Sequence, residues 1–188
     1  MTPAPASIVT DRLVLRRWQP GDRAPFAAMN ADPVVVRWFP RAMTREQSDA
    51  FVDRCETSFD REGVGPWALE RRDTGEFIGF AGLLWQRFEA PFTPALEVGW
   101  RLAHAHWGPG FAPEAAAAAL DDVFGRDVVA EVVSMTAVGN ANSRRVMEKL
   151  GMTHDPADDF DHVNVPPGHD LVRHVLYRLR REDWLARR

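Results

Sequence analysis

The segment from Glu97 to Glu114, EVGWRLAHAHWGPGFAPE, constrains the fold more than any other part of the sequence. Its first residues have the pattern of a β-strand that ends near Leu102, and an alanine-rich stretch with high helix propensity begins directly after Gly108 and Gly110. When a strand runs through a glycine loop into a helix, the unpaired first-turn amides of that helix point at the space beyond the loop. The segment therefore predicts an α/β fold, with either an ordinary strand-to-helix turn or an anion site at the loop.

The glycine spacing excludes the two common nucleotide-binding loops. The third glycine of a dinucleotide fingerprint would fall at Pro113, and no Gly-Lys-Ser/Thr triplet of a P-loop follows the glycines. Pro113 itself suits the first turn of a helix, where its missing N–H would have had no partner. A phosphate-bearing ligand of another kind is therefore expected.

Strand and helix patterns alternate through the rest of the chain. Thr44 and Gln47 match a capping box, Asp22 is placed to cap a shorter helix, and Gly151 is a C-terminal stop. The expected strands are 13–16, 67–71, 77–88, 95–102, 131–138 and 172–180, and the expected helices are 22–30, 44–62, 110–124 and 142–150. This order predicts one mixed sheet with helices on both faces.

Length and composition limit the class of protein. The 188 residues suit a single domain, expected over 10–188 after a flexible tail at 1–9. A net charge of −4 without a long run of one sign argues against a nucleic-acid partner.

Cys55 is the only cysteine, which excludes an internal disulfide and favours a reducing cytoplasm. Neither a secretory signal nor a membrane-spanning apolar run is seen, so no membrane association is expected.

The stretch from Val138 to Met152, VGNANSRRVMEKLGM, is the second informative motif. A strand leads through Asn140 and Asn142 to Ser143 and into a helix. Asparagine and serine are favoured helix caps, so capping by Asn140 or Asn142 is the structural interpretation of these residues.

Together the two motifs resemble the GCN5-related N-acetyltransferases (GNAT), in the branch similar to enzymes that acetylate the N-termini of ribosomal proteins. The resemblance runs from about Thr10 to Trp184 and includes TDRLVLRRW, NADPVV and HVLYRLRREDW. It implies a mixed, largely antiparallel sheet of six or seven strands, splayed between the fourth and fifth, with acetyl-CoA in the gap. It also implies a single N-acetyltransferase domain over 10–188.

The resemblance assigns residues to the cosubstrate. The backbone around Trp100, Arg101 and Leu102 should pair with the pantetheine arm, and Asn140 should bind that arm from the opposite side. The pyrophosphate should be held by backbone amides of Trp107, Gly108, Gly110, Phe111 and Ala112. Two positions depart from the family pattern. Ala105 stands where a Gln or Arg is common, and Met147 stands where many members carry a tyrosine general acid.

Acetyl transfer to an amine requires a neutral amine and a proton for the departing thiolate. Glu97 is the candidate base, its alternative being a solvated carboxylate paired with an arginine. Ser143 is the candidate proton donor, its alternative being a second helix cap. Cys55 lies away from both motifs, so direct attack in a ternary complex is expected rather than an acetyl-cysteine route.

The sequence leaves the acceptor open among a ribosomal or other peptide N-terminus, a polyamine, an amino acid and an aminoglycoside. A non-catalytic acyl-CoA-binding module is the main rival function. The resemblance implies that the acidic segment Asp155–Asp170 borders the acceptor side, where its carboxylates are expected to attract a cationic amine. The alternative is a solvated loop without a role in substrate binding. No zinc-like ligand spacing accompanies its histidines, so no metal is expected. A homodimer is the default oligomer.

Overall fold

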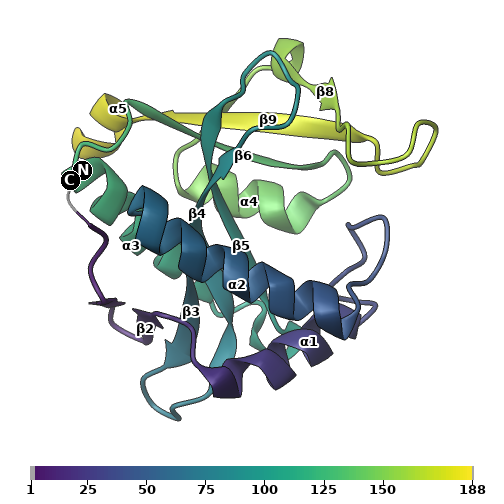
Figure 1. Cartoon of the computed structure of the whole chain (residues 1–188). Helices are drawn as coiled ribbons and strands as arrows, with labels where there is room; N and C mark the ends of the chain where they lie inside the picture. The colour runs from purple at the N-terminus through teal and green to yellow at the C-terminus, as the bar shows by residue number, and fades with distance from the viewer. Residues whose placement is uncertain (1–2, 188) are drawn as a thin grey trace.

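The computed structural model describes residues 3–187 as a twisted sheet flanked by helices (Figure 1). The strands are β1 (Ser7–Val9), β2 (Leu13–Arg16), β3 (Pro66–Arg71), β4 (Phe77–Gln86), β5 (Ala95–Leu102), β6 (Glu131–Ala137), β7 (Thr153–His154), β8 (Phe160–Asp161) and β9 (Arg173–Arg180). The α-helices are α1 (Arg23–Ala31), α2 (Arg45–Glu62), α3 (Phe111–Gly125), α4 (Ala141–Lys149) and α5 (Arg181–Leu185).

The sheet is mixed and largely antiparallel, as predicted. Its order is β1-β2-β3-β4-β5-β6-β9-β7, with β8 also paired to β9, and β5–β6 is the parallel pair. The described residues form nine strands rather than six or seven. The additional strands are among β1, β7 and β8, which have only two or three residues each. Strands this short carry too little alternation to be recognised from sequence.

Both ends of the described chain contain elements that differ from the expectation. Ser7–Val9 falls within the predicted flexible tail, yet it pairs with β2 as strand β1. The short helix α5 follows β9, where no helix was expected. Ordered pairing therefore begins before residue 10.

Strands β5 and β6 separate almost as soon as they meet, which confirms the expected splay. Their ladder contains one register pair, Glu97 with Val133, whereas β4 and β5 pair from Gly79–Leu102 to Gln86–Ala95. From Gly99 onward, β5 has no partner on its β6 side. Backbone groups of both strands are thus left free to face a ligand in the gap.

Helices cover both faces of the sheet. Phe80 packs with α1 and α2 through Phe26 and Phe51, whereas its neighbour Ala81 belongs to the core beneath α3. Successive residues of a strand point to opposite faces, so the two clusters lie on opposite sides of β4. The small side chains of Ala115, Ala116 and Ala119 are fully buried and let α3 approach closely.

The helix ends follow local rules with one exception. The capping box at Thr44 and Gln47 is present, and Gly63 ends α2 in the left-handed conformation. Asp22 precedes α1 but makes no side-chain capping bond. Instead its carboxylate accepts both terminal nitrogens of Arg16, at 2.7 and 2.9 Å. The predicted cap is therefore wrong, because a buried ion pair to β2 uses the carboxylate.

Candidate active site

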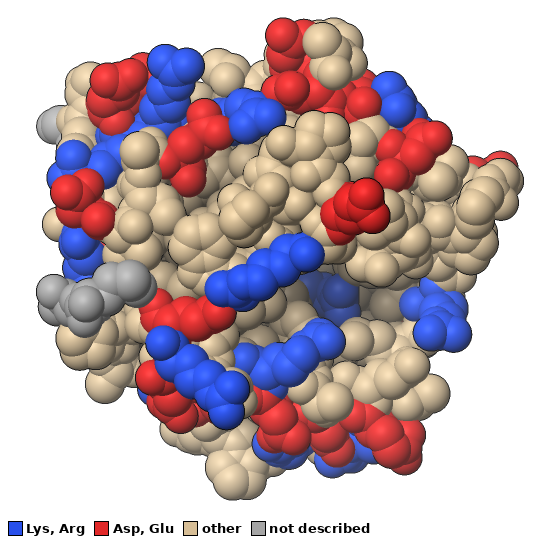
Figure 2. Space-filling view, turned by 45° about the horizontal axis from the view of Figure 1, so that its top comes forward, with Lys and Arg blue, Asp and Glu red and all other residues tan. Residues whose placement is uncertain are grey.

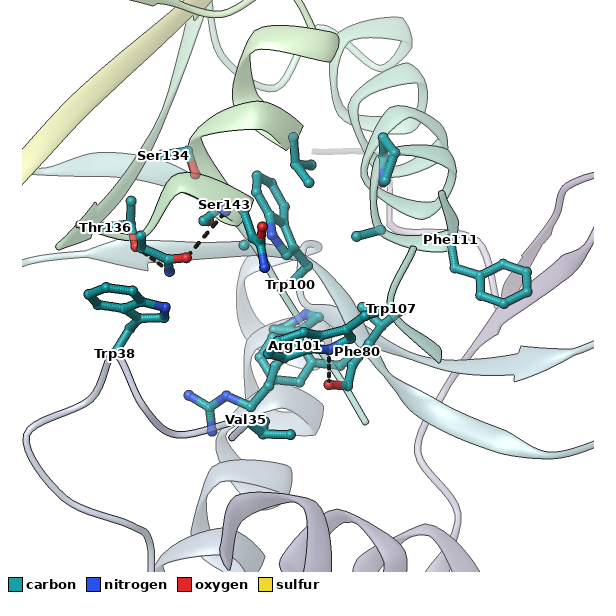
Figure 3. Close-up of a pocket in the computed structure, with 18 of the residues that line it drawn as sticks. Val35, Trp38, Phe80, Trp100, Arg101, Trp107, Phe111, Ser134, Thr136 and Ser143 are labelled. Atoms are coloured by element: carbon teal, nitrogen blue, oxygen red, sulfur yellow. Dashed lines mark hydrogen bonds between the residues drawn. The ribbon is translucent and has the colours of Figure 1, made fainter. Parts of the chain in front are cut away.

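A pocket of about 690 Å³ opens where β5 and β6 diverge (Figure 3). Its walls come from β4, β5, β6, the loop into α3, the start of α4 and the α1–α2 loop. Glu97 is its only carboxylate among the described residues, against three cations, Arg101, Arg145 and Lys149. Figure 2 shows a hollow with Lys and Arg on its rim and in its depth. In a protein of net charge −4, this pocket favours anionic ligands.

The loop into α3 is built to receive an anion. Gly108 and Gly110 have φ of 101° and 92°, and an added Cβ at Gly108 would meet no atom within 4 Å. The amides of Gly108, Gly110, Phe111 and Ala112 donate to no other group within residues 3–187. Free amides at a helix N-terminus beside open space form an anion cradle.

Trp107 differs from the expectation for this loop. Its backbone amide donates to the carbonyl of His104 at 3.1 Å, and its indole Nε1 donates to the carbonyl of Leu102 at 2.8 Å. The amide of Trp107 is therefore not free for a phosphate, and the Leu102 carbonyl already has a donor. His106 in the same loop is buried and lies 3.3 Å from a carboxylate oxygen of Glu76.

The anion cradle is braced from the N-terminal side of the chain. Glu114, in the first turn of α3, accepts from the Thr10 hydroxyl at 2.6 Å and from the Arg12 amide at 3.0 Å. Arg12 also donates to the carbonyl of Pro109 at 2.9 Å. Burial alone would raise the pKa of the Glu114 carboxyl, but the hydrogen bonds from Thr10 and Arg12 to this carboxyl lower it. The ionised carboxylate thus fixes the start of α3.

Glu97 lies in the pocket at the point where the splay begins. Burial raises the pKa of its carboxyl to about 7, and hydrogen bonds from the Met135 backbone and the Gln86 side chain only partly oppose this. The Gln86 amide donates to it at 2.7 Å. The alternative of a solvated carboxylate paired with an arginine is not observed. A carboxyl with a pKa near neutrality in a cleft has the properties of a general base.

The opposite wall is formed by the start of α4. Asn140 caps this helix, since its Oδ1 accepts the Ser143 amide at 3.3 Å and its Nδ2 donates to Thr136 at 2.9 Å. The capping interpretation of Asn140 is therefore confirmed. Both Asn140 and Ser143 also line the pocket, where Figure 3 shows Ser143 across from Trp38.

The floor of the pocket is an alternating row on β5. Glu97, Gly99 and Arg101 project from one face, and Gly99 lies opposite Gly82 of β4. An added Cβ at Gly99 would meet no atom within 4 Å. Glycine in this position leaves an open floor between a carboxylate and a guanidinium.

The roof is the loop between α1 and α2. Its Val35, Trp38 and Phe39 line the pocket and supply an apolar surface. Trp38 reaches the β6–α4 connection so closely that an added Cβ at Gly139 would lie 2.8 Å from its ring. The roof therefore spans the cleft from the β5 side to the β6 side.

Comparison with known proteins identifies this architecture. A family model described as an acetyltransferase (GNAT) domain matches residues 12–153, most of the chain. The chain belongs to the GNAT acetyltransferase family. As a GNAT protein it is an acyltransferase.

The chain is also similar to individual proteins. The uncharacterized protein YkkB of Bacillus subtilis (strain 168) is 34% identical over 150 residues, which cover 79% of this chain and 86% of YkkB. An Aspergillus fumigatus FsC-acetyl coenzyme A-N(2)-transacetylase is 29% identical, over 84% of this chain and 68% of that protein. The structure of a Vibrio fischeri ribosomal-protein-S5-alanine acetyltransferase superposes with a TM-score of 0.72 at 16% identity, covering 96% and 99% of the two chains. This last likeness shows the shared GNAT fold.

The acidic segment does not contribute to the GNAT pocket. No residue of 155–170 lines it. Asp158 and Asp161 pair with Arg178 and Arg173, while Asp159 bonds His154. The expected position of this segment beside the pocket is therefore wrong, and local partners use three of its carboxylates. Attraction of a cationic acceptor stays a prediction.

Other reactive groups also lie outside the GNAT pocket. Cys55 lies on the buried face of α2, and burial raises the pKa of its thiol. The Tyr177 hydroxyl is held between Arg144 and Glu148, each at 3.3 Å.

Within residues 3–187 no cluster of candidate metal ligands is found. No helix in this range has the length and apolar character to cross a bilayer.

Sequence reasoning missed several pocket residues. Gly99 and the side chain of Arg101 were not singled out, although polar residues alternating with glycine on one strand face, opposite the apolar Leu96 and Val98, are a readable signal of a lined cavity. The brace between Arg12 and Glu114 joins residues far apart in sequence, and no local pattern indicates it.

Proposed function

We propose that this GNAT protein transfers the acetyl group of acetyl-CoA to a primary amine by direct attack within a ternary complex. One observation carries the proposal: the gap between β5 and β6 brings a free-amide cradle and the carboxyl of Glu97 into one pocket. The cradle suits the diphosphate of the donor, and Glu97 suits the acceptor amine.

The donor site fits acetyl-CoA in chemistry and position. We assign the pyrophosphate to the amides of Gly108, Gly110, Phe111 and Ala112, with Arg145 and Lys149 as nearby counter-charges. The edge of β5 at Trp100 and Arg101, which has no strand partner on the β6 side, and the carboxamide of Asn140 would contact the pantetheine arm. Acetyl-CoA supplies the activated thioester at the splay.

Glu97 is assigned as the base that removes a proton from the attacking amine, directly or through water. With a pKa of about 7 it is partly ionised at neutral pH and returns to the neutral form at little cost after accepting a proton. Activity should therefore rise as pH increases through about 7.

Ser143 is assigned as the proton donor to the departing thiolate. It lines the pocket near the start of α4, and its hydroxyl has no hydrogen-bond partner within the described residues. Met147, at the position of the tyrosine that many relatives use, is fully buried and cannot donate a proton. The buried thiol of Cys55 argues against a covalent route and agrees with a cytoplasmic location.

The proposal is tested by offering acetyl-CoA and a panel of amines to the full chain and measuring release of free thiol, with mass spectrometry of the acetylated product. The panel contains amino acids, polyamines, an aminoglycoside and peptides with free N-termini. Binding of acetyl-CoA without amine-dependent thiol release would favour a non-catalytic acyl-CoA-binding protein.

Gly99→Val should block the acceptor side. A β-branched residue suits a strand, and the open space above Gly99 accommodates it without a clash. Its methyl groups would fill the floor beside Glu97, so we expect kcat/KM for the amine to fall by about 100-fold. Gly99→Ala should give a smaller loss. Equal activity of all three proteins would show that the amine does not cross this floor.

A further inference from the structure

Arg101 is a mostly buried cation without an anionic partner. The terminal nitrogen Nη1 of Arg101 donates to Asn30 Oδ1 at 2.6 Å and contacts the Met43 sulfur at 3.5 Å. Its Nε is buried without a hydrogen-bond partner, and within residues 3–187 no carboxylate forms an ion pair with it. A buried charge left in this state is costly unless something compensates it.

Aromatic rings complete the surroundings of this guanidinium. It lies 4.1 Å from the centre of the Phe39 ring and 5.8 Å from that of Phe80. These contacts hold a cation in place but leave its charge unneutralised. Burial lowers the pKa of Arg101 to about 10, so the group remains protonated at neutral pH.

The guanidinium points into the pocket under the roof. Figure 3 shows it directed toward Val35 and Trp38, away from the end of the pocket where Phe111 lies. The α3 cradle, which suits the donor's phosphates, is at that other end. Arg101 is therefore placed to meet the acceptor rather than the donor.

Glu97 and Arg101 face the same pocket from one strand. Four residues apart on β5, they have Cα atoms separated by roughly 13 Å, and both side chains line the pocket. Only Gly99 lies between them on this face. A molecule on the floor could present its amine toward Glu97 and an anion toward Arg101.

Building on the proposed acetyl transfer, we propose that the acceptor is a small amino-carboxylate, an amino acid or close analogue, whose carboxylate pairs with Arg101. A guanidinium binds a carboxylate through charge-assisted hydrogen bonds, and Nη2 of Arg101, which has no hydrogen-bond partner within the described residues, provides a donor. Val35, Trp38 and Phe39 provide an apolar wall for the acceptor's side chain. The roof contact of Trp38 at Gly139 favours a small acceptor over a polypeptide.

The first test compares phenylalanine, phenylalaninamide and phenethylamine as acceptors in the thiol-release assay. We expect kcat/KM for the acid to exceed that for the amide by about 10- to 100-fold. The carboxylate makes its neighbouring amine more basic, so a larger neutral fraction cannot explain this preference. Equal rates, or faster acetylation of peptide N-termini, would overturn the proposal while leaving acetyl transfer intact.

Substitutions distinguish carboxylate binding by Arg101 from a general effect on the enzyme. Arg101→Met keeps side-chain length among apolar neighbours and should abolish the preference for the acid, whereas Arg101→Lys should retain part of it. Arg41→Met is the matched control, since Arg41 is exposed on the same loop as Trp38 and does not line the pocket. A preference that persists in Arg101→Met would contradict the assignment.

A binding measurement decides the question without turnover. With CoA present, calorimetry should show N-acetylphenylalanine binding about 10- to 100-fold more tightly than N-acetylphenylalaninamide, and Arg101→Met should remove the difference. Melting curves establish that each variant is folded. If no amine is acetylated but this difference is found, acetyl transfer fails and the carboxylate site stands. Equal affinities for the two ligands would rule out the carboxylate site.

Discussion

Glu97→Gln should lower kcat by about 10² to 10⁴, the usual contribution of a general base, while acetyl-CoA binding stays near that of the wild type. The glutamine amide keeps the shape of the side chain and can still contact Gln86, but it cannot accept a proton from the amine. Steady-state kinetics with the best acceptor, and thermal shift with acetyl-CoA, measure the two effects separately.

The pH profile tests whether Glu97 is the group that titrates. Because burial raises its pKa to about 7, wild-type kcat/KM should increase as pH rises through 7, and this inflection should be missing in Glu97→Gln. High pH should partly rescue the variant by deprotonating the amine without a base. An unchanged inflection would assign the titration to another group.

Stability offers a check that does not depend on catalysis. Glutamate in an unfolded chain has a pKa near 4.3, so between that pH and about 7 the folded protein holds a proton that the unfolded chain has lost. The free energy of unfolding therefore falls as pH rises through this window. Glutamine does not titrate, so the Glu97→Gln variant does not lose stability at this position as pH rises. The melting temperature of the variant should therefore increase relative to that of the wild type between pH 4.5 and pH 7.5.

Gly110→Val should abolish stabilisation by acetyl-CoA. In the wild type, ligand at 100 times its dissociation constant adds about 2.7 kcal/mol, or roughly 5 to 10 °C in melting temperature. Valine is strongly disfavoured at a φ of 92°, and its side chain would alter the amides of the cradle. Thermal shift with and without acetyl-CoA measures the loss.

Two further variants distinguish a lost ligand site from a damaged helix. Ala112→Asp places a negative charge among the cradle amides, where it suits the helix dipole but repels a pyrophosphate, so the fold should persist while the shift disappears. Gly125→Ala, at the other end of α3 in open space, should retain the full shift. A full shift in both Gly110→Val and Ala112→Asp would place acetyl-CoA elsewhere.

Local sequence patterns predicted the main elements of this GNAT fold well. The capping box at Thr44 and the alanine run of α3 depend on neighbours within a few residues, and both helices begin where expected. The glycines at 108 and 110 likewise indicated the free amides of the cradle. Such features depend on contacts between residues that lie within about one helical turn of each other in the sequence.

The parts that sequence could not predict depend on distant partners. Asp22 has the right type and position for a cap, yet Arg16 binds its carboxylate. The aspartates of the acidic segment appear free in the sequence, yet Arg173 and Arg178 on β9 neutralise two of them. Arg101 is the reverse case, since nothing local indicates that a cation on a strand would be buried without a counter-ion.

The bracing of α3 by Thr10 and Arg12 couples the N-terminal hairpin of β1 and β2 to the anion cradle in the loop into α3. Any ligand that tightens the cradle must, by thermodynamic reciprocity, also hold β1 and β2 in place. Limited proteolysis near Arg12 would thus act as a remote reporter of coenzyme occupancy, with cleavage slowing as acetyl-CoA is added. A deletion that removes Thr10 would, by the same reciprocity, weaken coenzyme affinity without touching the pocket.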